Sequence, residues 1–313
     1  MISFVIPVYR SDKSLEELYQ RLTQTFANEM RGFEIIFVED CGGDHSWQII
    51  QKLSGTDSRV RGFRMNRNYG QHNVLLCGIR EAQGEIIVTL DDDLQHPPEE
   101  IFRLLLKLDE GFDVVYGLPE HEQHGLIRNL ASKITKLALQ NAFGVSNAQQ
   151  ISAFRAFRTH LRDAFADYRN PTVNIDVLLN WGTTSFSTVR VRHDLRKFGR
   201  SGYTSRKLLV HALDMTTGFS TRPLKFASII GFIFALFGLA ILAYILVSWL
   251  TQGSVVPGFV FLASIISIFS GAQLMMLGIF GEYLARIYFR TMDRPAYLVN
   301  SRSVKKLTQE KDD

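Results

Sequence analysis

The sequence contains only two cysteines, Cys41 and Cys77, and neither belongs to a CxxC motif. A disulfide framework and a zinc site are therefore not indicated, and the part of the chain that holds the cysteines is predicted to be reduced and to face the cytosol. The sequence also lacks an excess of charge of one sign, because 35 basic and 31 acidic residues leave a net charge of +4. Such a small net charge gives no reason to expect a nucleic-acid partner, and none is predicted.

Two further features are missing from the sequence: a known phosphate-binding motif and a signal-peptide pattern. Neither a GxGxxG fingerprint nor a GKS or GKT phosphate loop occurs, so a dinucleotide-binding fold and a P-loop enzyme lose their main support. The first ten residues, MISFVIPVYR, have too short an apolar run and no cleavage pattern for a signal peptide. We interpret them as a β-strand.

Long apolar runs are present in the last third of the chain. Residues 226–250 and 255–281 carry no charge, and each run exceeds the roughly 20 residues that a membrane-spanning helix needs. We therefore predict a transmembrane hairpin. The alternative is a pair of helices buried in a soluble core, which is disfavoured because soluble helices rarely lack a polar face over such a length.

Basic residues flank this hairpin on its outer sides. The connector TQGSVVP is uncharged, whereas cationic side chains precede the first span and follow the second: Arg222, Lys225, Arg286, Arg290 and Arg294. By the positive-inside rule, the chain is predicted to be a multi-pass protein of the inner (cytoplasmic) membrane with both termini in the cytoplasm.

Four regions follow from these patterns. They are a cytoplasmic catalytic domain at 1–203, an interfacial amphipathic helix at 204–222, the hairpin at 224–281 and a cytoplasmic tail at 282–313. The interfacial helix is predicted because leucines lie on one side of the segment, with basic residues beside them, directly before the first span.

The first two hundred residues alternate between short apolar runs and helical patterns. Runs rich in β-branched and aromatic residues predict strands at 2–8, 33–40, 60–65, 84–93 and 112–117. Helices are predicted at 14–26, with a capping box from Ser14 to Glu17, and at 46–53, 71–82 and 98–108. This order indicates an α/β fold with a mostly parallel sheet and helices on both faces, whose ligands bind at the carboxyl ends of the strands.

Acidic residues gather at two of those ends. The second predicted strand ends in Glu39-Asp40, and the fourth runs into LDDDLQHPPEE, which contains Asp91, Asp92, Asp93 and Gln95. A divalent cation, Mg²⁺ or Mn²⁺, offsets the repulsion in such a cluster and is usually held by one or two carboxylates plus substrate phosphates.

Strand geometry predicts which of these side chains converge. Alternate residues of an extended strand point to one side, so Asp91 and Asp93 are expected to converge, with Gln95 in the same register and Asp92 pointing elsewhere. The alternative is a solvated turn whose acids cap the helix that starts at Pro97-Pro98.

The chain resembles a known family at these and other positions. The matching segments are FVIPVYR, VEDCGGD, NRNYGQ, LDDDLQHPPE, FRAF, RKFGRSGY, FSTRPL and GEYLARIY, which together span residues 2 to 298. They resemble the membrane-anchored family 2 glycosyltransferases that load a sugar onto a polyprenyl phosphate. This group contains dolichyl-phosphate mannose synthases and bacterial undecaprenyl-phosphate glucosyltransferases.

The resemblance implies a GT-A (Rossmann-like) fold and an inverting, metal-dependent sugar transfer. The partners implied are a nucleotide sugar, with UDP-glucose favoured, polyprenyl (undecaprenyl) phosphate and the bilayer, while a homo-oligomer is left open. By motif, Asp91 and Asp93 would be catalytic and would hold Mg²⁺ or Mn²⁺ together with Gln95. Pro7, Tyr9, Glu39 and Asp40 would border the nucleotide, and the acceptor and other phosphates would meet Arg128, Ser132, Arg196 and Arg200.

Some alternatives stay open at this stage. Asp176, in VNIDVLLNW, is either a base near the acceptor or a structural acid on an apolar helix. A processive polysaccharide synthase is disfavoured because the chain is short, with two predicted spans and no QxxRW motif. A catalytically inactive nucleotide-sugar-binding scaffold is disfavoured by the intact acidic cluster.

Overall fold

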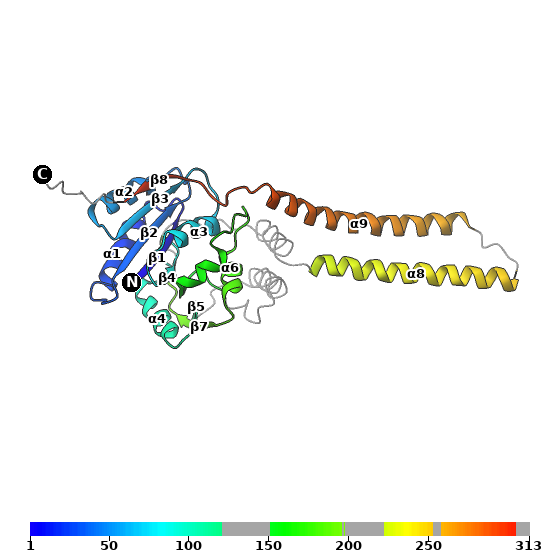
Figure 1. The fold of residues 1–313 in the computed structure, drawn as a ribbon, viewed down its shortest axis with the longest axis horizontal. Helices are drawn as coiled ribbons and strands as arrows, with labels where there is room; N and C mark the ends of the chain where they lie inside the picture. The colour runs from blue at the N-terminus through cyan, green and yellow to red at the C-terminus, as the bar shows by residue number, and fades with distance from the viewer. Residues whose placement is uncertain (121–150, 196, 198–221, 253–257, 305–313) are drawn as a thin grey trace. The chain divides into compact units, whose positions relative to one another are not determined.

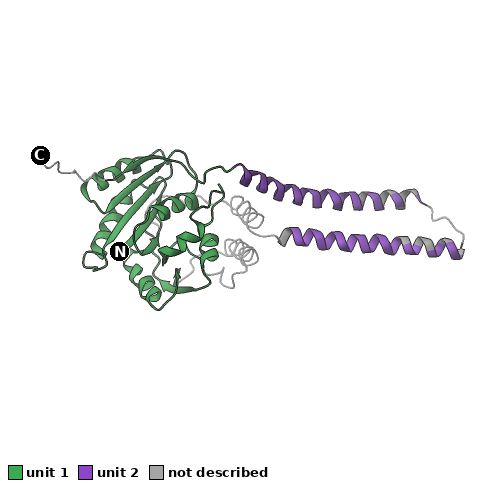
Figure 2. Cartoon of the chain, in the orientation of Figure 1, with its two compact units in different colours: residues 1–128, 149–202, 293–313 green, residues 129–148, 203–292 purple. Residues whose placement is uncertain are grey.

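The computed structural model describes residues 1–120, 151–195, 197, 222–252 and 258–304. The chain divides into two compact units (Figures 1 and 2). Among the described residues, unit 1 comprises 1–120, 151–195, 197 and 293–304, and unit 2 comprises 222–252 and 258–292. The predicted interfacial helix at 204–222 lies outside the described residues, apart from Arg222.

Unit 1 is built on one mixed sheet, which has eight strands within the described residues, in the order β7-β5-β6-β4-β1-β2-β3-β8. Strand β1 pairs in parallel with β2 and β4, β2 with β3, and β5 with β7, whereas β6 and β8 run antiparallel to their neighbours. The predicted mostly parallel α/β sheet is therefore confirmed. The strands are β1 Ile2–Val8, β2 Phe33–Glu39, β3 Val60–Met65, β4 Ile86–Thr89, β5 Val114–Pro119, β6 Arg155–Arg158, β7 Phe186–Val191 and β8 Val299–Ser303.

Helices cover both faces of this sheet, as predicted. Neighbouring residues of one strand, such as Phe4 and Val5, belong to two different apolar clusters, because successive side chains of a strand point to opposite faces. One cluster contains side chains of α1, α2 and α4, and the other contains those of α3 and α6. The helical elements are α1 Leu15–Thr25, α2 Ser46–Thr56, α3 Gln71–Glu81, η1 Pro98–Glu100, α4 Ile101–Asp109, η3 Thr159–Phe165 and α6 Ile175–Gly182.

The start of α1 differs from the prediction. Ser14 is the N-cap residue, but its side chain makes no capping hydrogen bond. Its hydroxyl donates instead to the carbonyl oxygen of Ser11, at 3.2 Å. The predicted capping box is therefore wrong, because the loop before α1 supplies a local acceptor for the hydroxyl.

A second difference concerns the end of the chain. Part of the segment predicted as a cytoplasmic tail forms β8, which pairs antiparallel with β3 at the edge of the sheet. The hydroxyls of Ser54 and Ser303 are 2.6 Å apart, and a side chain at Gly62 would meet Ile50 and Ser303. The chain thus returns to the sheet of unit 1 after both helices of unit 2.

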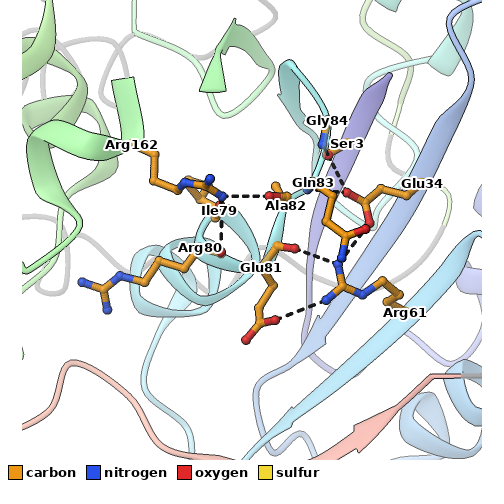
Figure 3. A network of polar contacts seen from close by, with 10 residues as sticks. All are labelled: Ser3, Glu34, Arg61, Ile79, Arg80, Glu81, Ala82, Gln83, Gly84 and Arg162. Atoms are coloured by element: carbon orange, nitrogen blue, oxygen red, sulfur yellow. Dashed lines mark hydrogen bonds and ion pairs between the residues drawn. The ribbon is translucent and has the colours of Figure 1, made fainter. Parts of the chain in front are cut away.

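A polar network holds the amino ends of the central strands and the end of α3 (Figure 3). Glu34 is 5% exposed, and one of its carboxylate oxygens accepts from the Ser3 hydroxyl at 2.7 Å. Arg61 donates to the other oxygen of Glu34 at 3.1 Å and also pairs with Glu81 at 3.2 Å. Because each buried charge has a partner, the network fixes α3 against β2 and β3 without leaving a lone buried ion.

Unit 2 is a pair of long apolar helices, α8 Arg222–Gln252 and α9 Phe259–Thr291. The stretches Leu224–Ile241 and Ile268–Thr291 are apolar enough to cross a membrane, and 6% and 0% of them, respectively, are buried. These low fractions argue against the alternative of a soluble core. Phe234 and Phe269 pack edge to face at 5.5 Å between the ring centres.

Helix α9 runs beyond the predicted end of the second span at residue 281. The prediction stopped there because Glu282 is charged. In the structure Glu282 forms an ion pair with Arg286 one turn later, at 2.8 Å. Such a pair between residues i and i+4 supports the helix rather than ending it.

The two cysteines are expected to differ sharply in reactivity. Cys41 is exposed, whereas Cys77 is buried in α3, and burial raises the pKa of Cys77 to about 12. The thiolate is the reactive form, so a thiol reagent at pH 8 should titrate one thiol in the native protein and two after unfolding. A Cys41→Ser variant should show none before unfolding, and rapid labelling of that variant would contradict the assignment.

Candidate active site

The carboxyl ends of β1, β2 and β4 lie side by side. Val8 pairs with Glu39, and Val5 pairs with Thr89. The segments that follow these strands therefore meet at one edge of the sheet, as parallel pairing requires. Pro7 is buried and Tyr9 is 46% exposed at this edge.

The acidic run itself forms a turn rather than a strand. Strand β4 ends at Thr89, and Leu94 has a positive φ of 62°. The expectation of an extended strand through Asp93 is therefore wrong. The reason is that ladder pairing with β1 and β6 ends at Thr89, and the chain turns at Asp92 and Asp93.

The three carboxylates of this turn accept hydrogen bonds from different donors. The side-chain amide of Gln71 donates to Asp91 Oδ1 at 2.7 Å. Asp92 Oδ2 accepts from the Tyr9 backbone N–H at 3.1 Å and from the Ser11 hydroxyl. Asp93 Oδ1 accepts from the Gln95 backbone N–H at 3.0 Å. Donated hydrogen bonds thus offset part of the repulsion among the three acids.

Asp92 is the acid that anchors a loop. Its two donors both belong to the segment between β1 and α1, which contains Tyr9. Burial raises the pKa of Asp92 to about 6, although these hydrogen bonds act in the opposite direction. Asp92 therefore fastens the β1–α1 loop to the acidic turn.

Glu39 and Asp40 are also engaged by nearby loops. Glu39 is 1% exposed, accepts from the Gly42 N–H at 2.6 Å and pairs with Arg64 at 3.1 Å. Asp40 accepts from the N–H groups of Tyr69 and Gly70, at 2.7 and 2.9 Å. Burial raises the pKa of Asp40. Both side chains fix the loops around the site, and their contact with a nucleotide stays a prediction.

His96, which follows Gln95, was not singled out from the sequence. Its ring stacks on Phe154 and packs edge-on against His193, with both ring centres 5.0 Å away. Burial lowers the pKa of His96 to about 3, so the ring is neutral near pH 7. It packs the segment after the acidic turn against Phe154, the residue just before β6. A histidine before two prolines carries no sequence signal for such packing.

A buried ion pair lies beside the end of β4, the strand that leads into the acidic turn. Arg155 on β6 is ion-paired with Asp176 on α6, and these side chains are 2% and 9% exposed. Arg155 also donates to the Thr89 hydroxyl, and the Tyr116 hydroxyl donates to Asp176, both at 3.0 Å. Because its carboxylate is held by these two donors, the structural role of Asp176 is favoured over that of a base.

Four predicted phosphate-binding residues cannot be placed. Arg128, Ser132, Arg196 and Arg200 lie outside the described residues. Their roles therefore stay predictions.

The chemistry of the acidic turn fits a divalent cation. Among the described residues, no group of three or more His, Cys, Asp or Glu side chains is arranged to hold a metal ion. Asp91, Asp93 and Gln95 offer two carboxylates and an amide oxygen instead. That donor set suits Mg²⁺, which is typically held by one or two carboxylates together with substrate phosphates.

Solved structures define the class of fold. Glucosyl-3-phosphoglycerate synthase from Mycobacterium tuberculosis, in complex with phosphoglyceric acid, matches with a TM-score of 0.51 at 19% identity, over 69% of this chain and 80% of that one. The same enzyme with Mn²⁺, UDP-glucose and phosphoglyceric acid matches with a TM-score of 0.51 at 18% identity, over 69% and 79% of the two chains. The fold is therefore the GT-A glycosyltransferase fold.

Sequence comparisons identify the family. The profile described as Glycosyl transferase family 2 matches residues 3–168. Undecaprenyl-phosphate 4-deoxy-4-formamido-L-arabinose transferases from Salmonella choleraesuis and Salmonella paratyphi B are each 35% identical over 301 residues, which is 95% of this chain and 92% of theirs. The chain belongs to glycosyltransferase family 2, and the predicted resemblance to its polyprenyl-phosphate branch is confirmed.

Proposed function

We propose that this protein transfers a sugar from a UDP-sugar to undecaprenyl phosphate, with inversion at the anomeric carbon and with a divalent cation, Mg²⁺ or Mn²⁺. The similarity to the Salmonella transferases carries this proposal, because it extends over 95% of the chain. It thus includes the acidic turn of unit 1 and both apolar helices of unit 2. The structurally similar synthase in complex with Mn²⁺ and UDP-glucose supports the choice of cation and base.

The identity of the sugar is a finer proposal. UDP-glucose is favoured by the sequence, whereas the names of the Salmonella relatives point to a 4-deoxy-4-formamido-L-arabinose donor. A panel of UDP-sugars, each incubated with undecaprenyl phosphate, would decide between them. The preferred donor is the one with the highest kcat/KM.

The transfer requires two anionic groups, the acceptor phosphate and the diphosphate of the donor, to be held close together. The acceptor phosphate is already largely dianionic near neutral pH, because its second pKa is about 6 by analogy with phosphoserine, so it needs no strong base. A cation bound by Asp91, Asp93 and Gln95 would stabilise the negative charge of the leaving diphosphate. The chain's own contribution is to orient these ligands through Gln71 and the turn around Leu94 and to hold the acceptor phosphate with arginines.

We also propose that the hairpin is inserted with both termini in the cytoplasm. The basic residues beside its outer ends, Arg222, Lys225, Arg286, Arg290 and Arg294, support this orientation. The acceptor phosphate would then be used at the inner leaflet, on the side where nucleotide sugars are available.

One experiment separates the candidate functions. Full-length protein in detergent is incubated with labelled UDP-sugar and undecaprenyl phosphate, with and without excess EDTA. A single lipid-linked sugar that disappears in EDTA supports the proposal. A polymeric product would favour a processive synthase, and no product with any donor would favour a binding scaffold. Full activity in excess EDTA would contradict the proposed metal dependence.

The anchor role of Asp92 leads to a testable prediction on donor binding. In Asp92→Ala the β1–α1 loop loses two hydrogen bonds, so the donor KM should rise about tenfold, or roughly 1.4 kcal/mol. Asp92→Asn keeps an oxygen that can accept both bonds and should stay within about twofold of the wild type. Steady-state kinetics with varied donor would measure both. Equal damage in the two variants would contradict the anchor role.

A further inference from the structure

The first turn of α3 joins three separate parts of unit 1. Gln71 donates to Asp91 at 2.7 Å. His72 Nδ1 accepts from the Ile175 N–H, at the start of α6, at 3.3 Å. Asn73 donates from its side-chain amide to the carbonyl oxygens of Pro171 and Ala296, at 2.9 and 2.6 Å. Three consecutive side chains therefore contact the acidic turn, α6 and the chain segment that follows α9.

The bond from Asn73 to Ala296 is buried, and the one to Pro171 is part-buried. Asn73 is 6% exposed and Ala296 is 3% exposed, so a carbonyl that lost its donor here could not turn to water and would remain unsatisfied. Such a loss costs about 1–3 kcal/mol. Asn73 is therefore a fixed attachment between α3 and the segment after α9.

That segment runs along α3 for several residues. The Asn66 N–H donates to the Leu298 carbonyl at 2.9 Å, and Arg80 lies over the ring of Tyr297 at 5.7 Å. Arg302 on β8 pairs with Glu81 at 3.3 Å. The returning chain thus contacts both ends of α3, at Asn73 near the acidic turn and at Glu81 away from it.

The position of Gln71 depends on the groups on either side of it. Before it, Asp40 holds the N–H groups of Tyr69 and Gly70, and Gly70 has a positive φ of 88°. After it, Asn73 holds the helix to Ala296 and Pro171. A shift of this turn would carry the Gln71 backbone with it and would therefore disturb the hydrogen bond from the Gln71 amide to Asp91.

We propose that Asn73 is a positioning residue for the acidic turn: it ties the segment arriving from α9 to the first turn of α3 and thereby holds Gln71 on Asp91. This inference rests on the proposed metal-dependent function, in which Asp91 is a ligand. Groups that orient metal ligands change metal affinity by about 10- to 100-fold when removed. The segment after the membrane hairpin thus contributes to the metal site without contacting it.

The test measures Mn²⁺ affinity rather than turnover. Full-length wild type, Asn73→Ala, Gln71→Ala and the double variant are titrated with Mn²⁺ in the presence of saturating UDP, by calorimetry or by electron paramagnetic resonance of free Mn²⁺. Each single variant should bind Mn²⁺ about tenfold more weakly. The double variant should be no weaker than Gln71→Ala alone, because both changes act through one contact.

Arg302→Ala is the matched control. It loosens the same returning segment at the far end of α3, and its Mn²⁺ affinity should equal that of the wild type. The melting temperature of each variant is measured so that binding is compared well below unfolding. If Asn73→Ala does not fold, Asn73→Ser, which keeps one donor, should show a smaller but measurable loss of affinity.

Three results would overturn the inference, and each points to a different failure. Wild type that binds Mn²⁺ while the folded Asn73 variant binds it equally well would overturn the positioning role alone. Wild type that binds no Mn²⁺ with UDP would overturn the metal-dependent function and, with it, this inference. An equal loss of affinity in Arg302→Ala would show general loosening rather than positioning through Asn73.

Discussion

Replacing Asp93 by alanine is expected to lower sugar transfer by about 1000-fold, because a bound cation contributes several kcal/mol to stabilising the leaving diphosphate and each 1.36 kcal/mol is a factor of ten. The fold should survive, since the hydrogen bond that is lost, from the Gln95 N–H to Asp93 Oδ1, is local to the turn and only part-buried. Transfer of labelled sugar to undecaprenyl phosphate measures the loss, and thermal melting checks the fold.

Two further variants separate charge from structure at this position. Asp93→Asn keeps an oxygen that can accept the Gln95 N–H but removes the negative charge, so it should be nearly as inactive as Asp93→Ala. Asp163→Ala, at an exposed acid of η3, should retain full activity. Wild-type turnover in either Asp93 variant would remove Asp93 from the proposed metal ligands.

The second large effect is expected on stability. Asp176→Ala leaves Arg155 as a lone charge whose side chain is 2% exposed, and it removes the acceptor of the Tyr116 hydroxyl. Breaking a buried pair in this way costs about 3–5 kcal/mol. For a unit of this size the melting temperature should fall by roughly 10 °C. Differential scanning fluorimetry of the detergent-solubilised chain would measure the shift.

A double variant tests the cause of this loss. Asp176→Ala combined with Arg155→Leu removes both charges, so it should be more stable than Asp176→Ala alone. A double variant that is less stable than either single variant would contradict the lone charge as the cause. A fall of less than about 2 °C in Asp176→Ala itself would show that the pair contributes little.

Much of the fold could be predicted from the sequence where local pattern and burial agree. Strands 2–8 and 60–65 are predicted with the bounds that the structure has, because short runs with β-branched and aromatic residues, bounded by polar or turn residues, favour strands. Strands β6, β7 and β8 are not among the predicted strands. The sequences of β6 and β8, RAFR and VNSRS, are short and polar, and only pairing with distant strands makes them part of a sheet.

The candidate site could be predicted in part for a similar reason. Parallel pairing brings the ends of β1, β2 and β4 together, so the convergence of Tyr9, Glu39 and the acidic run followed from the order of the strands. The hydrogen-bond partners of the individual acids do not follow from that order. Gln71 contacts Asp91 and Ser11 contacts Asp92, and these side-chain contacts join segments that are distant in the sequence, so no local pattern indicates them.

The place of β8 has a consequence for how the protein is made. Ribosomes release the chain from its N-terminus, and domains generally fold in that order. The outer edge of β3 therefore has no neighbour until both α8 and α9 have been synthesised, because β8 comes after them. An open strand edge is a template for pairing with another chain. The nascent chain thus exposes this strand edge until α8 and α9 have been made, and pairing with β8 then covers it.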